Sequence, residues 1–381
     1  MSVKDLDTDY MARALQLAQK GQYTTHPNPR VGCIIVKNNQ IIGEGFHQRS
    51  GKPHAEINAL LQLQQSQANQ SSAQGATAYV TLEPCSHTGK TPPCANALIE
   101  AGVSRVVLAM QDPNPQVAGQ GIERLRQAGI EVKVGVLEEQ ARALNAGFIK
   151  RMEKGLPWVR VKLAMSLDGK TAMASGESQW ITGKEARRDV QFLRAKADAI
   201  LTGIGTILAD DPSLNVRLSA AELGIDGEVN QPIRVVLDSQ LQTPLVAKLF
   251  KIEGDTLIVT TKKDEALAQK LRSQGAEVLL LEKNESARLP LKTVLKTLAQ
   301  REINEVHVEA GATLCGALIQ ENLVDEIIIY MAPTLMGADA RSLLNFSGVD
   351  AMSDKINLEI TDLRAVGKDW RISAKPLSFD G

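Results

Sequence analysis

Short apolar runs alternate with helical patterns along most of this chain. In its first part, runs at 78–82, 105–110 and 131–136 are separated by helical patterns at 94–101 and 122–128. Strands that alternate with helices favour layered α/β structure, because each helix can bury one face against a shared sheet. We therefore predict an α/β sandwich for the N-terminal part.

The segments ahead of these runs fit the same architecture. Residues 9–20 and 54–65 have helical periodicity, and two short apolar runs, 31–36 and 40–45, are joined by Asn38-Asn39. Asparagine pairs between short apolar runs are typical of a hairpin turn. We predict a β-hairpin between two helices.

The pattern starts again after residue 157. A strand is predicted at 158–165, and Thr182 and Glu185 form a capping-box pattern that predicts a helix to about residue 195. Further strands are predicted at 199–202, 233–238, 256–261, 278–281, 305–310 and 326–332, with a helix at 311–321 and a closing hairpin of 356–366 and 369–375.

A helical run at 138–154 ends at Gly155 and Pro157 and marks a junction. The second half is not a copy of the first. We therefore expect two domains, at 1–150 and 155–378.

Charge and composition exclude several classes of protein. The 43 basic and 44 acidic side chains nearly cancel, so no global field attracts nucleic acid or an anionic membrane. No run approaches the about 20 apolar residues that span a bilayer, and the polar first ten residues do not resemble a secretory signal. Four cysteines are too few for a disulfide scaffold. We expect a soluble, cytoplasmic protein that binds neither nucleic acid nor membrane.

Metal-binding side chains gather in the first quarter of the chain. His54, Cys85 and Cys94 lie there, together with three of the other four histidines. Imidazole and thiolate are the ligands that zinc prefers, and three protein ligands leave a fourth position for water. Cys94 begins a predicted helix, whose positive end favours thiolate. The three residues predict a zinc site.

Glu56 gives this site a chemical role. His54-Ala-Glu56 followed by Pro84-Cys85 matches the signature of zinc base deaminases, in which zinc activates a water and the glutamate carries protons without binding the metal. Eight residues separate Cys85 from Cys94, where ordinary members have two. The alternative is a closed structural zinc site with His47 or His87 as fourth ligand, but it leaves the Glu56 spacing unexplained.

Longer motifs around these residues resemble a known family. They are His26-Pro-Asn-Pro-Arg-Val-Gly32, Gly45-Phe-His47 and Pro84-Cys-Ser-His-Thr-Gly-Lys-Thr-Pro-Pro-Cys94. Together with His54-Ala-Glu56 they resemble the deaminase of riboflavin biosynthesis over essentially the first 150 residues. The resemblance implies a cytidine-deaminase-like fold. It also implies that the pyrimidine substrate is bound by Asn28, His47, His87 and Lys90. We interpret His26 as a loop residue and Cys33 as part of the core.

The second half lacks the Gly-x-Gly-x-x-Gly motif of the dinucleotide-binding fold, so a nicotinamide enzyme here needs another architecture. Two glycine-containing turns, 202–206 and 309–317, each follow a predicted strand. Backbone amides at such a helix start can bind phosphate, although small residues there are as often explained by tight packing.

Four motifs of the second half resemble the reductase of the same pathway, whose fold is similar to dihydrofolate reductase. They are Lys162-Leu-Ala-Met-Ser-Leu-Asp-Gly-Lys-Thr-Ala172, Gly176-Glu-Ser-Gln-Trp-Ile-Thr182, Ala209-Asp-Asp-Pro-Ser-Leu214 and Val308-Glu-Ala-Gly311. The resemblance implies that NADPH contacts Ala164, Trp180, Thr206, Asp210, Gly311, Ala312, Thr313, Leu314, Cys315, Gly316 and Ala317. It implies that the substrate contacts Lys162, Ser178, Arg194, Leu214, Arg217 and Glu309.

Some of these residues have plainer interpretations. Arg194 and Arg217 suit a phosphate monoester, because guanidinium groups make paired hydrogen bonds, but surface arginines are common. Trp180 could anchor a core, and Asp168 could fix a turn. Lys162 and Glu309 are candidates for proton transfer, with roles that the sequence does not assign.

The expected function is therefore that of a bifunctional enzyme. It would deaminate 2,5-diamino-6-(5-phosphoribosylamino)pyrimidin-4-one with zinc, then reduce the ribosyl group to ribityl with NADPH. Because deaminases of this fold commonly associate, we expect a homo-oligomer, a dimer or a tetramer. The alternatives are a zinc deaminase of another nucleoside, nucleotide or tRNA, and a non-enzymatic, zinc-stabilised binding module.

Overall fold

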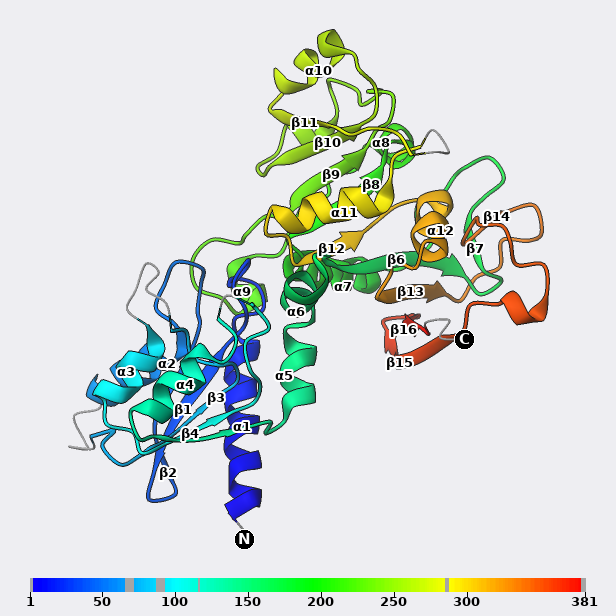
Figure 1. The fold of residues 1–381 in the computed structure, drawn as a ribbon. Helices are drawn as coiled ribbons and strands as arrows, with labels where there is room; N and C mark the ends of the chain where they lie inside the picture. Colours follow the sequence, from blue (N-terminus) through cyan, green and yellow to red (C-terminus); the bar gives the residue numbers. More distant parts are fainter. Residues whose placement is uncertain (1–2, 66–71, 87–92, 116, 285–287, 378–381) are drawn as a thin grey trace. The chain divides into compact units, whose positions relative to one another are not determined.

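The computed structural model describes the chain except residues 1–2, 66–71, 87–92, 116, 285–287 and 378–381. The chain divides into two compact units, Met1–Gly155 and Leu156–Gly381. Each unit has its own main sheet (Figure 1) and its own hydrophobic cores.

The first unit is built on a five-stranded sheet in the order β2-β1-β3-β4-β5. The hairpin strands β1 and β2 are antiparallel, β1 is antiparallel to β3, and β3, β4 and β5 run parallel. The strands are β1 Gly32–Lys37, β2 Gln40–Phe46, β3 Thr77–Val80, β4 Arg105–Leu108 and β5 Glu131–Val134. Asn38 and Asn39 both have positive φ, as the predicted hairpin turn requires.

Helices cover both faces of this sheet. Along β1 the side chains alternate, so Cys33 and Ile35 enter the core beneath α2, α3 and α4, while Ile34 and Val36 enter the core beneath α1, α5 and α6. The helices are α1 Val3–Gln19, α2 Ala55–Gln65, α3 Cys94–Glu100, α4 Gln120–Gln127, α5 Glu138–Leu144 and α6 Ala146–Lys154. This arrangement confirms the predicted α/β sandwich, although the helical run expected at 138–154 is interrupted at Asn145.

Helix α2 lies unusually close to strand β2. A Cβ added to Gly45 would lie 2.3 Å from the backbone nitrogen of Ala59 and 2.4 Å from the carbonyl oxygen of Ala55. Only glycine allows this approach, which places the first turn of α2 directly on the sheet.

The second unit contains a nine-stranded sheet in the order β11-β10-β9-β8-β12-β6-β13-β16-β15. All neighbours are parallel up to β13, after which β16 and β15 are antiparallel. The strands are β6 Trp158–Ser166, β8 Ala199–Gly203, β9 Ile233–Leu237, β10 Thr256–Thr260, β11 Ala276–Leu280, β12 Glu305–Val308, β13 Glu326–Ala332, β15 Leu358–Val366 and β16 Asp369–Pro376. Short strands β7 (Lys170–Ala172) and β14 (Arg341–Ser342) pair separately.

The two faces of this sheet differ at its centre. One face packs on α11 (Leu291–Gln300) and α12 (Ala312–Gln320), and the other on α7 (Lys184–Lys196), α8 (Ile204–Asp210) and α10 (Glu265–Arg272), with α9 at Ala220–Leu223 (Figure 1). On the second face of the sheet, β6 and β12 carry Arg160, Lys162 and His307 instead of apolar residues; His307 is fully buried and the other two are partly buried. A largely buried polar row thus crosses the middle of the sheet.

The capping box predicted at Thr182 is wrong. Helix α7 begins at Lys184 with Gly183 as its N-cap, and no side chain caps it locally. Instead, the Gly183 N–H donates to the carboxylate of Asp369 in β16, at 2.6 Å.

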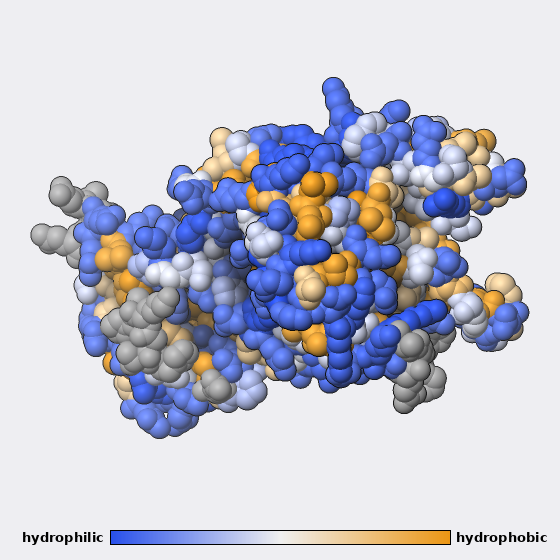
Figure 2. Space-filling model, turned by 90° about the horizontal axis from the view of Figure 1, so that it is seen from above, coloured by the Kyte–Doolittle hydropathy of each residue, from blue (hydrophilic) through white to orange (hydrophobic). Residues whose placement is uncertain are grey.

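The face shown in Figure 2 is mostly hydrophilic, and hydrophobic residues form small groups among hydrophilic ones, as on most folded proteins. Among the helices that the structure describes, none has the length and apolar character needed to cross a membrane.

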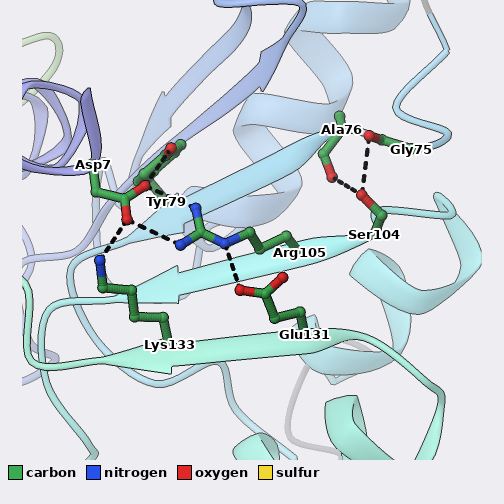
Figure 3. A network of polar contacts seen from close by, with 8 residues as sticks. All are labelled: Asp7, Gly75, Ala76, Tyr79, Ser104, Arg105, Glu131 and Lys133. Carbon is green, nitrogen blue, oxygen red and sulfur yellow. Dashed lines mark hydrogen bonds and ion pairs between the residues drawn. The ribbon is translucent and has the colours of Figure 1, made fainter. Parts of the chain in front are cut away.

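A buried carboxylate joins α1 to the sheet of the first unit. Asp7 is 1% exposed and accepts two hydrogen bonds from Arg105 (2.8 and 3.0 Å), one from Lys133 (2.7 Å) and one from Tyr79 (2.9 Å). Figure 3 shows these donors converging on Asp7 from β3, β4 and β5. Burial alone would raise the pKa of Asp7, but the bonds from Arg105, Lys133 and Tyr79 outweigh it and hold that pKa well below its usual value.

The Asp7→Asn variant should lower the free energy of unfolding by about 2–3 kcal/mol at pH 7, because two cations lose a charged partner. A carboxylate with a depressed folded pKa stabilises above its unfolded pKa of about 3.9 and loses that effect as the pH falls. The difference between wild type and variant in urea denaturation should therefore be full above about pH 5 and shrink below about pH 4. A difference that stays constant from pH 7 to pH 3 would contradict this account.

Candidate functional site

The predicted metal ligands meet at one end of the first unit. The ligand atoms of His54, Cys85 and Cys94 all lie within 4.8 Å of one another. His54 Nδ1 is 3.6 Å from Cys85 Sγ and 3.3 Å from Cys94 Sγ. Ligands at zinc distances of about 2.0 and 2.3 Å in a tetrahedron would be about 3.5 Å apart, so the donor set and its spacing fit zinc.

Each ligand is placed by a different element. His54 precedes α2, and its carbonyl accepts the first helical hydrogen bond from Asn58 (3.0 Å). Cys94 is the first residue of α3. Cys85 lies outside helices and strands, where its carbonyl accepts from Ala95 N–H and its sulfur from Cys94 N–H, each within 3.3 Å.

The cluster favours thiolate at Cys85. The hydrogen bond from Cys94 lowers the pKa of the Cys85 thiol, and the bond with His54 lowers it further. The same bond with Cys85, together with burial, raises the pKa of Cys94. The bond with Cys85 also raises the pKa of His54. Cys85 is therefore the sulfur that loses its proton more readily, and a thiolate suits the binding of a cation.

Glu56 lies beside the ligands, in the first turn of α2, and is 3% exposed. Burial raises its pKa to about 7, and the charge of Cys85 contributes. A carboxyl group with a pKa near neutrality can both accept and donate a proton. As the sequence predicts, His54 and Glu56 converge because one precedes the helix and the other is in its first turn.

His47 is fixed in one orientation. Its Nδ1 lies 3.2 Å from the carbonyl oxygen of Pro53, to which it must donate, so its Nε2 accepts from the Asn28 side chain, also at 3.2 Å. Its ring packs edge-on against His54. With both nitrogens engaged, His47 is not a fourth ligand. The other candidate, His87, lies outside the described residues, as does Lys90.

The loop that carries Asn28 is held by Asn145, the residue between α5 and α6. Asn145 Oδ1 accepts the Arg30 N–H (2.8 Å), and its Nδ2 donates to the Arg30 carbonyl (2.9 Å). The Arg30 guanidinium also donates to Leu144 O and approaches His26 Nε2. His26 is thus a loop residue as expected, and Cys33 is fully buried in the core. Asn145 carries no motif that would have revealed this role in the sequence.

A second cluster forms in the other unit. Arg194 of α7 makes a paired salt bridge with Glu309, which follows β12, at 2.6 and 3.0 Å. Burial alone would raise the pKa of Glu309, but Arg194 and His307 hold it well below its usual value. Burial lowers the pKa of Lys162 on β6, Glu309 opposes this effect and Arg194 adds to it. The three predicted residues therefore share one charged environment.

Other predicted substrate residues lie around this cluster. Arg217 is exposed to solvent at its surface, but partial desolvation of its guanidinium lowers its pKa. The charge of Arg194 lowers this pKa further and that of Glu309 opposes the shift, so Arg217 lies in the same electrostatic field. The Leu214 side chain is buried in the core beneath α8, so only its backbone is available. Ser178 is half-buried.

Trp180 is 70% exposed, and the Arg187 guanidinium lies 4.4 Å from the centre of its ring. The interpretation of Trp180 as a core anchor is therefore wrong. Asp168 does fix loops as expected: its carboxylate accepts from Ser166 Oγ and from the N–H groups of Met336 and Gly337.

The predicted cofactor residues lie at the carboxyl ends of neighbouring parallel strands, where ligands bind in open α/β sheets. Ala164 is near the end of β6, Thr206 and Asp210 are in α8 after β8, and the segment from Gly311 to Ala317 opens α12 after β12. A Cβ on Gly203 would contact Leu314, so the starts of α8 and α12 are neighbours. Asp210 accepts from Gln179 (3.4 Å).

Within the α12 segment the residues differ in exposure. Gly311 and Thr313 are exposed, and Ala312, Leu314 and Ala317 are half-buried. Cys315 belongs to the hydrophobic core, and Gly316 packs against the backbone of Asn345. The exposed residues of this segment, Gly311 and Thr313, thus lie at the start of α12.

Comparisons with known proteins agree with the folds of both units. Residues 4–110 match the cytidine and deoxycytidylate deaminase zinc-binding region, and residues 157–372 match the RibD C-terminal domain. The chain is 50% identical to the riboflavin biosynthesis protein RibD of Escherichia coli (strain K12) over 368 residues, which cover 95% of this chain and 97% of that protein.

This chain belongs to the RibD family. Among solved structures, Acinetobacter baumannii RibD, form 2, is 46% identical with a TM-score of 0.87, covering 99% of this chain and 100% of that chain. A deaminase/reductase from Thermotoga maritima is 32% identical with a TM-score of 0.85, at 99% and 100% coverage. Membership of this family confirms the expected pair of folds, a cytidine-deaminase-like unit and a RibD-type reductase unit.

The Cys94→Ser variant should lose zinc, because serine oxygen replaces a thiolate ligand. The matched control is Cys33→Ser, a buried cysteine of β1 outside the cluster. Zinc per chain, measured by elemental mass spectrometry after dialysis, should fall from about one to near zero only in Cys94→Ser. Equal zinc content in both variants would refute the assignment of Cys94.

Proposed function

We propose that this RibD-family chain catalyses two consecutive steps of riboflavin biosynthesis. The first unit would remove the amino group of 2,5-diamino-6-(5-phosphoribosylamino)pyrimidin-4-one by zinc-dependent hydrolysis. The second would reduce the ribosyl group of the product to ribityl with NADPH. The observation that carries this proposal is the convergence of His54, Cys85 and Cys94 beside the buried Glu56, in a chain whose other unit has the RibD-type reductase fold.

Glu56 is the proposed proton carrier of the first step. Zinc bound by His54, Cys85 and Cys94 would supply an activated water. Glu56 would accept a proton at its carboxylate and return it to the departing ammonia, since burial keeps its pKa near 7. Asn28 and His47 would hold the pyrimidine, because the His47 ring packs against His54 and its Nε2 accepts from the Asn28 side chain. We assign His87 and Lys90 to the same substrate.

The charged cluster of the second unit is the proposed site of reduction. Lys162 and Glu309 would lie at the ribose, with Arg194 holding Glu309 in place through its paired salt bridge. Arg217 would bind the phosphate of the substrate, since guanidinium groups make paired bonds to phosphate oxygens. Ser178 and the Leu214 backbone would complete the substrate site.

NADPH would lie along the carboxyl edge of the sheet, between Ala164, Trp180, Thr206, Asp210 and the first turn of α12. The amides of Gly311 to Leu314 suit a phosphate group there. The hydride would come from the cofactor, and the protein would supply its position.

We further propose that the protein is a homo-oligomer, a dimer or tetramer, that works in the cytoplasm. The edge strand β15 exposes Leu358, Ile360 and Leu363, and a free apolar edge favours pairing with another chain. The four cysteines are free thiols, as in a reducing compartment. Light scattering during size-exclusion chromatography would report the mass of the particle in solution. A monomer at micromolar concentration would contradict the proposed homo-oligomer.

A sequential assay on the purified chain tests the two activities. The diaminopyrimidine phosphate should release ammonia without NADPH, and NADPH should be oxidised only after that release. Ammonia release without NADPH oxidation would refute the reductase assignment alone. Neither signal, with zinc bound, would refute the proposed substrate.

The Glu56→Gln variant should lose ammonia release by about 100-fold or more, because the proton carrier is removed. Zinc content should stay unchanged, and so should NADPH oxidation when the deaminated intermediate is supplied. Loss of zinc in this variant would show that Glu56 supports the metal instead.

The Arg217→Met variant should raise the KM of the reduction by about 10- to 100-fold, as expected for loss of a charged hydrogen bond. Because Arg217 is exposed, the fold should tolerate the change. The matched control is Arg188→Met, an arginine that pairs with Glu222 at 3.0 Å on the surface. Identical KM values for both variants would remove Arg217 from the phosphate site.

A further inference from the structure

Glu83 lies two residues before Cys85, and the proposed chemistry leaves its side chain without a role. This residue is 3% exposed. Its carboxylate is a hydrogen-bond acceptor for four backbone N–H groups that lie 29 to 39 residues further along the chain. Oε2 accepts from Asp112 (3.1 Å) and Gly119 (3.0 Å), and Oε1 accepts from Gly121 (2.8 Å) and Ile122 (3.2 Å).

These donors are mainly the free amides at the start of α4. The first N–H groups of a helix have no partner within it, and negative charge is favourable at this end. The N-cap residue of α4 is Gly119, which has no side chain to cap the helix. Glu83 therefore caps α4 from a loop that is distant in the sequence.

The backbone on either side of Glu83 is held as well. Its own N–H donates to Met110 O at 3.0 Å. A Cβ added to Gly121 would lie 2.1 Å from the carbonyl oxygen of Pro84, so the first turn of α4 touches the residue that precedes Cys85. The short segment before Cys85 is thus fixed by its side chain and by its backbone.

Cys85 needs such support more than the other two ligands. His54 is held at the start of α2 and Cys94 lies within α3, whereas Cys85 belongs to no helix or strand. A shift of about 1 Å in its sulfur would spoil the spacing that fits zinc.

We propose that Glu83 is a positioning residue of the metal centre. By binding the amides of α4, its carboxylate holds Cys85 at the distance from His54 and Cys94 that zinc requires. This inference rests on the proposed zinc site, and goes beyond it by assigning a role to a residue that touches neither metal nor substrate.

The test is the zinc affinity of the full-length Glu83→Gln variant, measured by competition with a chromophoric chelator. Glutamine keeps the shape but places an NH2 group against two N–H donors. Zinc affinity should fall by about tenfold or more, and the thiolate-to-Co²⁺ absorption of the cobalt form should change. The matched control is Asp7→Asn, another buried carboxylate with several donors, on the opposite face of the sheet.

A purely stabilising role predicts the same result for both variants. The proposal expects Asp7→Asn to unfold at a lower temperature with wild-type zinc affinity and cobalt spectrum. It is overturned if Glu83→Gln binds zinc as wild type does, or if both variants lose the same affinity. Absence of zinc from the wild-type chain would instead refute the proposed metal site.

If Glu83→Gln does not fold, hydrogen exchange of the wild-type chain tests the positioning role of Glu83. Bound zinc should slow exchange of the amides from Gly119 to Ile122 more than those of α1, because Glu83 couples the ligand loop to α4. Equal slowing in both segments would overturn the positioning role.

Discussion

The close contact between α2 and β2 at Gly45 is the constraint on which the metal cluster depends. Two residues separated by one position usually point to different sides of a helix. His54 and Glu56 share one site because the chain enters α2 between them, and that entry point is set by how deeply the helix sits on the sheet. A side chain at position 45 would meet the backbone of Ala55 and Ala59 and lift this turn. The spacing to Cys85 and Cys94 would then change as well.

In the second unit, several charged side chains lie together on one sheet and are largely removed from solvent. Parallel pairing places Arg160 opposite His307 and, one step further, brings Lys162 beside Glu309. Arg160 is balanced by Glu305 and Glu326, and Arg194 by Glu309. A buried charge is tolerated when it is paired, and unpairing one member is costly. The row is therefore stable as a set, and its end at Lys162 and Glu309 is the part that we propose lies at the substrate.

Much of this could be predicted from the sequence, because the decisive signals are local. The strands alternate with helices, Asn38-Asn39 marks a turn, and the metal ligands stand in a motif. The predictions that were wrong or missing depend on contacts between residues that are far apart in the sequence. Thr182 loses its expected capping role because the Gly183 N–H donates to Asp369, which lies 186 residues after Gly183. Helix α8 was not predicted, since Gly203 and Gly205 weaken its local signal, and its start packs against Leu314 of α12, more than 100 residues later. Glu83 was visible beside the motif, but its partners lie far along the chain.

The two hydrogen bonds between the Asn145 side chain and the Arg30 backbone limit where the first unit can be truncated. One asparagine side chain satisfies both backbone groups of Arg30, much as a neighbouring strand would. A truncated first unit that stopped at the end of its sheet, or even after α5, would leave that N–H and that carbonyl without partners and loosen the loop bearing Asn28. A self-sufficient fragment must therefore extend through α6, beyond the last strand by twenty residues, Gly135 to Lys154. The Asn145 side chain, between α5 and α6, and not the end of β5, therefore decides where the first unit can be shortened.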